Sequence, residues 1–363
     1  MLPGLGAVDG GATDPAGGAA EAFAGGLDDP APPGVQATAR AAAPTRIRPR
    51  RRDVARCFMV GDTHSRLIRF LPFIHDQSGD DERMRPTATD EPGVELLDAG
   101  DGRRLDRLGT RLVDRPAPSA VWPPRLPPSD WAAADVRFDR DAGWTGGDVT
   151  PWTVAVDGLT LELRPTAAGQ IGLFPEHVGF WPWLRVSLAG HADPSVLHLF
   201  AHTGATTLAL AGAGARVTHV DASRPAVAWA RHNAELSGLA DRPIRWIVDD
   251  AQAFIEREGR RGRLYDGFVI DPPSYGHGPR GTRWELAEAL PDLLDACAAV
   301  ATVDAVVLLT AHTTGLDAND LADALIDAFE PAPGIEFIAE SIEETARSGA
   351  VLPLGVAARM IRG

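Results

Sequence analysis

Short apolar runs and longer amphipathic runs alternate along the chain from residue 196 onward. Five apolar runs are dense enough for buried parallel strands, and they lie at residues 196–200, 216–220, 244–248, 265–270 and 305–309. A helical pattern follows each run, at residues 205–210, 225–237, 251–260, 286–300 and 316–329. Two closing strands are expected at residues 335–342 and 351–361. These repeats predict an α/β fold, a doubly wound, mostly parallel sheet with its ligand at the carboxyl ends of the strands.

The region before this alternation has the pattern of a smaller, β-rich domain. Strand-like stretches lie at residues 94–98, 111–114, 136–138, 152–156 and 159–163. The last two are joined by Asp157-Gly158, which is a hairpin signal. We assign residues 85–168 to this domain and residues 169–363 to the larger one. The sequence leaves open whether the small domain helps to hold a substrate or only caps its neighbour.

The first 84 residues show no apolar periodicity, and their Gly-, Ala- and Pro-rich start cannot bury enough surface to fold. We therefore expect residues 1–84 to be a disordered extension or a mis-assigned start. A second segment is ambiguous in another way. Phe180, Trp181, Trp183 and Leu184 form an aromatic, amphipathic segment ahead of the first strand. That spacing is typical of core packing, with a base-stacking platform as the alternative.

The composition is typical of a globular protein, with 44% hydrophobic and 23% charged residues. No apolar run approaches the roughly 18 residues of a membrane helix, and no secretory signal is recognisable. Cys57 and Cys297 are too few and too far apart for a disulfide or metal framework. A cytoplasmic protein is therefore expected. The net charge of −15 argues against a surface that binds nucleic acid all over, but it permits a local basic patch.

The first strand, turn and helix carry a candidate ligand site. The turn Ala201-His202-Thr203-Gly204 follows the first apolar run, and the second strand ends at Asp221. A turn glycine lets a ligand approach the backbone closely, and the acid can accept hydrogen bonds from ribose hydroxyls. The alternative is an ordinary strand–helix–strand unit whose turn binds nothing.

Acids follow two more strands, at Asp250 (with Asp249 beside it) and at Asp271. In a doubly wound sheet these strand ends line one crevice, so the acids are expected to converge on one ligand. The turn lacks the G-x-G-x-x-G pattern that cradles a pyrophosphate. A nucleoside without phosphate fits better, with Asp221 on the ribose, Asp250 on an adenine amine and an amino-acid tail near Gly204. S-adenosylmethionine is such a ligand.

The sharpest motif is Asp271-Pro272-Pro273-Ser274-Tyr275, after the fourth strand. Two prolines fix φ and remove backbone donors, so they make a rigid rim. The acid can accept a hydrogen bond from the amine of a base, and the aromatic ring can stack on an extruded base. A purely structural Pro-Pro turn is the alternative.

These stretches together resemble the class I S-adenosylmethionine-dependent methyltransferases of the 23S rRNA large-subunit methyltransferase I type. The resemblance rests on LFAHTGATTLA, VTHVDAS, WARHNAELSGL, WIVDDAQAF, YDGFVIDPPSYG and LLTAHT, and covers roughly residues 169–363. It implies a Rossmann-like domain with a final antiparallel strand within residues 351–361. The cofactor contacts that it implies, besides Asp271, are Phe200, Ala201, His202, Thr203, Gly204, Ala205, Asp221, Ala222, Ser223, Asn233, Asp249, Asp250 and Ala251.

One departure from that family bears on the chemistry. Members that make 5-methylcytosine carry a cysteine nucleophile after the fifth strand, where this chain has Thr310-Ala311-His312-Thr313. A carbon acceptor is therefore doubtful. An amine or ring nitrogen already has a lone pair and needs only in-line placement. No metal is expected, because the spacing of His202, His277 and His312 does not support a site.

The sequence therefore predicts a methyltransferase that uses S-adenosylmethionine to methylate RNA, with a base of rRNA as the acceptor, by direct transfer. Asp271 would orient the acceptor, Tyr275 would stack on it, and Pro272 and Pro273 would form the rim of the site. Two alternatives stay open. One is a protein of the same fold that binds S-adenosylmethionine or RNA without catalysis, and the other is an NAD-type oxidoreductase.

Overall fold

The computed structural model describes residues 68–70, 93–277, 283–331 and 333–362. The chain divides into two units, Met1–Gln36 and Ala37–Gly363, and every described residue belongs to the second. Most of the predicted extension, residues 1–84, lies outside the described residues. Within it, strand β1 (Ile68–Phe70) pairs in parallel with β16 (Ile335–Thr345). The domain boundary at residue 84 stays a prediction.

The large sheet has eight strands in the order β1-β16-β17-β15-β12-β9-β10-β11. The five predicted strands are present and pair in parallel. They are β9 (Ser195–Leu199), β10 (Arg216–Asp221), β11 (Ile244–Val248), β12 (Tyr265–Ile270) and β15 (Ala301–Ala311). The strand order reverses at β9, which has β10 on one side and β12 on the other. The carboxyl ends of these three strands therefore form the crevice that holds ligands in such sheets.

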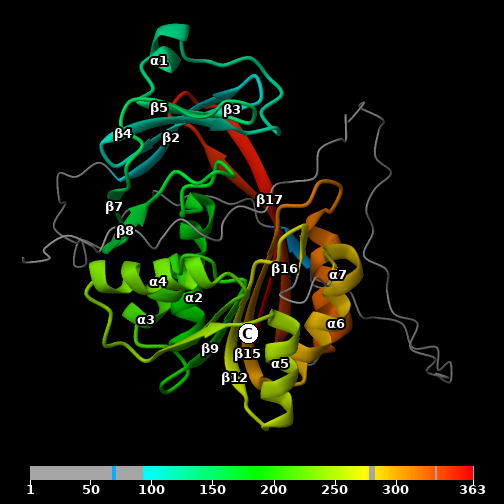
Figure 1. The fold of residues 1–363 in the computed structure, drawn as a ribbon. Coiled ribbons are helices and arrows are strands. Elements are labelled where there is room, and N and C mark those ends of the chain that lie inside the picture. The colour runs from blue at the N-terminus through cyan, green and yellow to red at the C-terminus, as the bar shows by residue number, and fades with distance from the viewer. Residues whose placement is uncertain (1–67, 71–92, 278–282, 332, 363) are drawn as a thin grey trace, which may run out of the picture. The chain divides into compact units, whose positions relative to one another are not determined.

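Helices cover both faces of this sheet. On one side lie α2 (Trp181–Leu188), α3 (Ala205–Gly212) and α4 (Arg224–Leu236), and on the other lie α5 (Ala251–Arg260), α6 (Leu286–Ala298) and α7 (Ala318–Phe329) (Figure 1). Each face has its own buried hydrophobic cluster. Both predicted closing strands are present as well, since β17 (Val351–Arg362) runs antiparallel to β15 and β16. The predicted fold class is confirmed.

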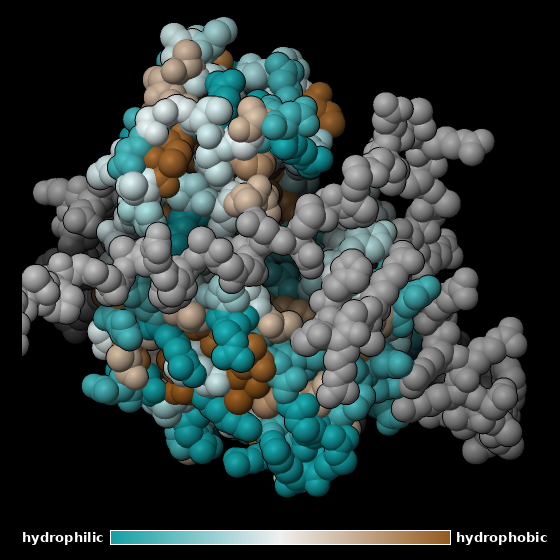
Figure 2. Space-filling model, in the orientation of Figure 1, coloured by the Kyte–Doolittle hydropathy of each residue, from teal (hydrophilic) through white to brown (hydrophobic). Residues whose placement is uncertain are grey.

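The amphipathic pattern of the helices explains how they pack. In α5, Phe254 and Ile255 are buried against the sheet, whereas Glu256 and Arg260 are exposed. The surface over this helix is accordingly hydrophilic (Figure 2). None of the helices in the described ranges combines the length and apolar composition needed to cross a membrane.

The aromatic segment ahead of β9 belongs to the core, as the packing interpretation predicts. A 3₁₀ helix, η1 (Pro175–Phe180), leads directly into α2. Phe180, Trp181 and Leu184 are all buried, and the indole Nε1 of Trp181 donates to Thr206 Oγ1 at 3.0 Å. These aromatic rings therefore anchor α2 against α3 and are not available to stack on a base.

The β-rich region forms a five-stranded sheet and a separate hairpin. Its elements are β2 (Val94–Gly100), β3 (Arg103–Leu108), β4 (Arg111–Pro116), α1 (Pro128–Ala132), β5 (Val136–Asp139), β6 (Gly143–Gly146), β7 (Trp152–Val156) and β8 (Leu159–Leu163). The sheet order is β2-β3-β4-β5-β6, and β7 pairs only with β8 among the described strands. The predicted Asp157-Gly158 hairpin is thus confirmed.

Strand β3 was not predicted from the sequence, because buried charged residues interrupt its apolar pattern. Asp106 is fully buried and accepts hydrogen bonds from Arg104 and Arg115. Arg104 also forms an ion pair of 2.7 Å with Glu344 in β16. A periodicity analysis treats such charges as exposed, yet here they neutralise one another in the interior. The same network ties the β-rich region to the large sheet.

A chain of buried histidines lies under the crevice. His198 Nδ1 in β9 is 2.8 Å from Thr207 Oγ1, and that hydroxyl oxygen is 3.0 Å from His219 Nδ1 in β10. Burial lowers the pKa of His198 to about 3 and lowers the pKa of His219 well below 6.5. Both rings are therefore neutral in the folded protein at any pH near 7.

The buried, neutral state of His198 and His219 predicts that the protein loses stability in acid. Above pH 6.5, the ordinary pKa of histidine, both rings are neutral in the folded and unfolded states. The two rings therefore do not lower the free energy of unfolding in that range. As the pH falls from 6.5 toward 3, only the unfolded state takes up the protons, so each ring should cost about 1.4 kcal/mol of unfolding free energy per pH unit. Urea unfolding across this range measures the slope. His198→Asn, which keeps a polar atom for Thr207, should reduce the slope by about that amount. An unchanged slope would show that His198 titrates normally.

Candidate functional site

The turn after β9 has a strained backbone that only a few residue types accept. Gly204 has a φ of 82°, and the non-glycine residues Phe200 and His202 have φ values of 56° and 46°. Left-handed backbone at non-glycine residues is costly and tends to persist at functional sites. Gly204 also precedes the first residue of α3, so the turn presents the N-terminus of that helix at the crevice.

Gly204 is expected to be intolerant of a side chain. A Cβ there would lie 2.9 Å from Ala230 Cβ, in addition to requiring the left-handed backbone. Gly204→Ala should therefore lower the free energy of unfolding by about 2–3 kcal/mol. Gly238 is a matched control, because its φ is 66° and nothing lies within 4 Å of an added Cβ. Gly238→Ala should cost only about 1 kcal/mol. Urea unfolding compares them, and equal losses would mean that the contact with Ala230 is unimportant.

Asp221 holds the two loops that flank the crevice. Its Oδ2 accepts a hydrogen bond of 2.8 Å from the backbone N–H of His202, and its Oδ1 accepts one of 2.8 Å from that of Ser223. A carboxylate has about four lone-pair sites, so both oxygens can accept further hydrogen bonds. Asp221 is thus placed to bind hydroxyls. Its neighbour Ala222 is exposed, and Ser223 caps α4 by accepting from Ala226 N.

Thr203 and Asn233 support the turn from below. Thr203 Oγ1 donates to the carbonyl oxygen of Gly172, and Asn233 Nδ2 donates to the carbonyl oxygen of Thr203 at 3.0 Å. The other end of the Asn233 amide accepts from the backbone N–H of Glu162 at 2.9 Å. Asn233 therefore links the β-rich hairpin to the turn. Direct contact of Asn233 with a cofactor stays a prediction.

The acids after β11 lie beside Asp221, because the backbone N–H of Asp249 donates to the carbonyl oxygen of Asp221 at 3.1 Å. Asp250 Oδ1 caps α5 by accepting from Ala253 N at 2.9 Å. Asp249 forms an ion pair with Arg257. Of the predicted contact residues, Ala251 and Ala201 are buried in the structure, and Ala205 begins α3. Their contact with a cofactor stays a prediction.

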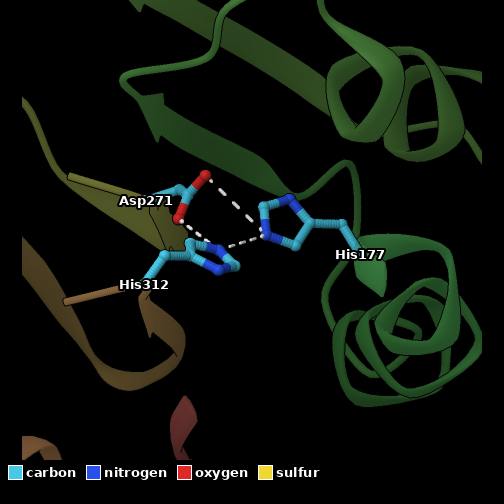
Figure 3. Close-up of side chains that lie close together, drawn as sticks. All are labelled: His177, Asp271 and His312. Carbon is cyan, nitrogen blue, oxygen red and sulfur yellow. Dashed lines mark hydrogen bonds and ion pairs between the residues drawn. The ribbon is translucent and has the colours of Figure 1, made fainter. Parts of the chain in front are cut away.

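Asp271 follows β12 and lies at the centre of a polar cluster. Its Oδ1 accepts a hydrogen bond of 2.6 Å from Thr310 Oγ1 and lies 3.5 Å from His312 Nε2. Its Oδ2 lies 3.7 Å from His177 Nε2, and the two histidine Nε2 atoms are 3.3 Å apart (Figure 3). The sequence indicated Asp271 but not its partners. Nothing in the local pattern marks His177.

Asp271 and His312 stabilise each other's charged forms. Burial alone would raise the pKa of Asp271, but the charge of His177, and the hydrogen bond and charge of His312, hold it well below its usual range. Burial opposes protonation of His312, yet its interactions with Asp271 raise its pKa to about 9. Asp271 is therefore an anion at neutral pH. An anionic carboxylate accepts hydrogen bonds and is a poor proton carrier.

His202 lies between the two predicted halves of the site. Burial lowers its pKa, while the charges of Asp221 and Asp271 both act to raise it. Its ring centroid is also 5.4 Å from that of Phe174, which in turn contacts His177 at 5.8 Å. One buried imidazole thus interacts with the carboxylates of Asp221 and Asp271, and the convergence of all three acids on one ligand stays a prediction.

The rim after Asp271 is held by an aromatic residue that the sequence analysis missed. Trp284 Nε1 donates to the carbonyl oxygen of Pro273 at 2.7 Å, and its ring centroid is 5.2 Å from that of Phe200. Pro272 is buried. Tyr275, in β13 (Tyr275–His277), is 64% exposed, so its ring face is open to a stacking partner. Strand β13 pairs with β14 (Arg283–Glu285), which carries Trp284.

A cavity of about 860 Å³ adjoins the cluster. It is lined by Arg140 of the β-rich region, by Gln170 and Phe174, and by His312 and Thr313 after β15. A cavity of this size is ample for a nucleotide-sized ligand. His312 belongs to both the cavity and the cluster, so the cavity reaches the side chain that lies 3.5 Å from Asp271.

Comparison with known proteins identifies the family to which the chain belongs. No protein-family model matches the chain. The ribosomal RNA large subunit methyltransferase I of Klebsiella pneumoniae is 32% identical over 160 residues, which is 40% of this chain and 37% of that protein. The ribosomal RNA large subunit methyltransferase K/L of Stutzerimonas stutzeri is 35% identical over 128 residues, 35% of this chain and 17% of that protein. The chain thus spans well under half of these curated relatives.

A solved structure matches over a much larger share. The SAM-dependent methyltransferase from Agrobacterium tumefaciens is 32% identical, with a TM-score of 0.72. The match covers 81% of this chain and 94% of that one. The resemblance drawn from the motifs is confirmed, and the chain belongs to the S-adenosylmethionine-dependent methyltransferases.

Proposed function

We propose that this chain transfers the methyl group of S-adenosylmethionine directly to an amine or ring nitrogen of a base in RNA. The observation that carries the proposal is the position of Asp271. It is an anionic hydrogen-bond acceptor that follows β12, 3.5 Å from His312, and His312 lines the cavity. Ribosomal RNA is the first substrate to test, because the named relatives act on it.

The cofactor side of the proposal rests on the Gly204 turn and on Asp221. When bound, S-adenosylmethionine supplies an electrophilic methyl group. Both oxygens of Asp221 retain lone pairs for the two ribose hydroxyls after binding the N–H groups of His202 and Ser223. Asp250 uses one oxygen as a helix cap and keeps the other for an adenine amine. The hydrogen-bond acceptors of this site therefore fit a nucleoside without a pyrophosphate.

Direct transfer is supported by the state of the cysteines. Cys297 is fully buried in α6, and burial raises the pKa of its thiol far above the usual range. It can neither reach a substrate nor form a thiolate. Cys57 lies outside the described residues. An acceptor with its own lone pair needs no such nucleophile, because the new N–C bond forms as the C–S bond of the sulfonium breaks.

Asp271 would orient the acceptor base by accepting a hydrogen bond from the N–H of its amine, which places the acceptor nitrogen in line with the methyl group. The lowered pKa keeps Asp271 ionised, so its role is positioning and charge stabilisation. A methylated amine then loses a proton to water, whereas a methylated ring nitrogen keeps the positive charge. Tyr275 would stack on the base, and Arg140 would contact phosphate in the cavity.

Two measurements test the proposal. Calorimetry of the full chain should detect binding of S-adenosylmethionine and none of NAD. Incubation with radiolabelled S-adenosylmethionine and RNA from cells that lack the gene should label RNA, and mass mapping of its nucleosides should locate a methylated nitrogen. Binding without any transfer would favour the non-catalytic alternative, and a methylated pyrimidine carbon would refute direct transfer to nitrogen.

A further inference from the structure

His177, Asp271 and His312 come from three separate parts of the chain and point at one another. His177 lies in η1, Asp271 follows β12, and His312 follows β15 (Figure 3). Two imidazole Nε2 atoms and a carboxylate therefore share one small space. The pairwise distances are 3.3 Å between the two Nε2 atoms, and 3.5 and 3.7 Å from them to the carboxylate oxygens.

The separation of the two Nε2 atoms matches that between two ligands of a tetrahedral metal ion. With metal–ligand bonds of about 2.0–2.1 Å, neighbouring ligand atoms in a tetrahedral site are about 3.3–3.4 Å apart. The two nitrogen–oxygen distances involve different oxygens of Asp271, Oδ1 for His312 and Oδ2 for His177, and one ligand atom from each of the three side chains lies within 4.8 Å of the others. All three side chains therefore offer a ligand atom to one small space.

The surroundings prepare the ligands. His312 Nδ1 lies 2.7 Å from the carbonyl oxygen of Leu354, and a carbonyl can only accept, so the hydrogen of the neutral ring is on Nδ1. When a metal ion displaces the proton on Nε2, that atom presents a lone pair to the cluster, which is the usual arrangement of metal-binding histidines. Thr310 Oγ1 donates a hydrogen bond to Asp271 Oδ1, which holds the carboxylate in place. Both interactions fix the orientation of a ligand.

We propose that His177, Asp271 and His312 form a binding site for a divalent transition metal of the Zn²⁺ type, with a fourth position open. Two imidazoles and one carboxylate favour such an ion over Mg²⁺ or Ca²⁺, which prefer oxygen ligands. The side chains are 16%, 18% and 31% exposed for His177, Asp271 and His312, so an ion can enter. His312 also lines the cavity of about 860 Å³, which provides a route.

Metal binding and the proposed methyl transfer should compete. The metal would take the oxygens of Asp271 that the acceptor amine needs, so an equivalent of Zn²⁺ should slow transfer. This consequence rests on the proposed function, whereas binding of the ion does not. The two fail separately, because metal binding is measured without S-adenosylmethionine or RNA.

Co²⁺ and Zn²⁺ added to the full chain test the site. Co²⁺ should give the intense visible bands of a four-coordinate site, and Zn²⁺ should displace it. His64, His75 and His277, whose side chains are not described, can contribute background binding. The measured quantity is therefore the number of metal equivalents bound, which should be one lower in His177→Ala or His312→Ala than in wild type.

His232→Ala is the matched control. His232 is a half-exposed histidine on α4, 3.7 Å from Glu162 and 3.6 Å from Glu235, and among the described side chains it belongs to no cluster that could hold a metal ion. The control should keep the full number of equivalents and the Co²⁺ spectrum. Each cluster variant should lose one equivalent, or weaken it at least about tenfold. Unfolding curves confirm that the variants are folded. Unchanged binding and spectra in both cluster variants would overturn the proposal.

Discussion

Replacing Asp271 with alanine is expected to slow methyl transfer about 100- to 1000-fold, with little change in the affinity for S-adenosylmethionine. The reason is that Asp271 is the ionised acceptor after β12, whereas the residues assigned to the cofactor lie after β9, at the end of β10 and after β11. Loss of an oriented charge affects only the reacting geometry. Single-turnover rates with labelled S-adenosylmethionine measure the effect, and calorimetry measures the affinity.

The conservative variant separates charge from geometry. Asp271→Asn keeps one oxygen for the acceptor and for Thr310 but removes the charge that pairs with His312. It should retain more activity than the alanine variant. Both assays need a chelator, so that an ion bound to the cluster does not mask the result. Transfer at the wild-type rate in Asp271→Ala would show that another group orients the acceptor.

The strand ends could be predicted from the sequence because each depends on a local pattern. An apolar run followed by an acid identifies the end of a buried strand, and the alternation with helices fixes a parallel order. Asp221, Asp250 and Asp271 were placed correctly at the ends of their strands for this reason. The Gly204 turn was found in the same way, since a left-handed residue before a helix favours glycine.

The partners of Asp271 could not be predicted, because they depend on tertiary packing. The adjacency of β12 and β15 brings His312 close to Asp271. His177 reaches the cluster only because buried Phe180 and Trp181 pin η1 and α2 against the sheet. The spacing of histidines therefore gave no sign of a metal site. Trp284 was missed for a similar reason, since its role depends on the β13–β14 pairing across a gap in the described residues.

The second large effect is expected at Asp221, where alanine should weaken the binding of S-adenosylmethionine about 100-fold. Two losses combine in this variant. The ribose loses the carboxylate that the proposal assigns to it, and the N–H groups of His202 and Ser223 lose their acceptor, so the strained turn loosens. Asp241→Ala is the control, because Asp241 is exposed in the loop after α4. Calorimetry at a temperature where both variants are folded gives the two affinities. An affinity for Asp221→Ala within about threefold of wild type would remove Asp221 from the cofactor site, because that change is under 1 kcal/mol and less than one charged hydrogen bond provides.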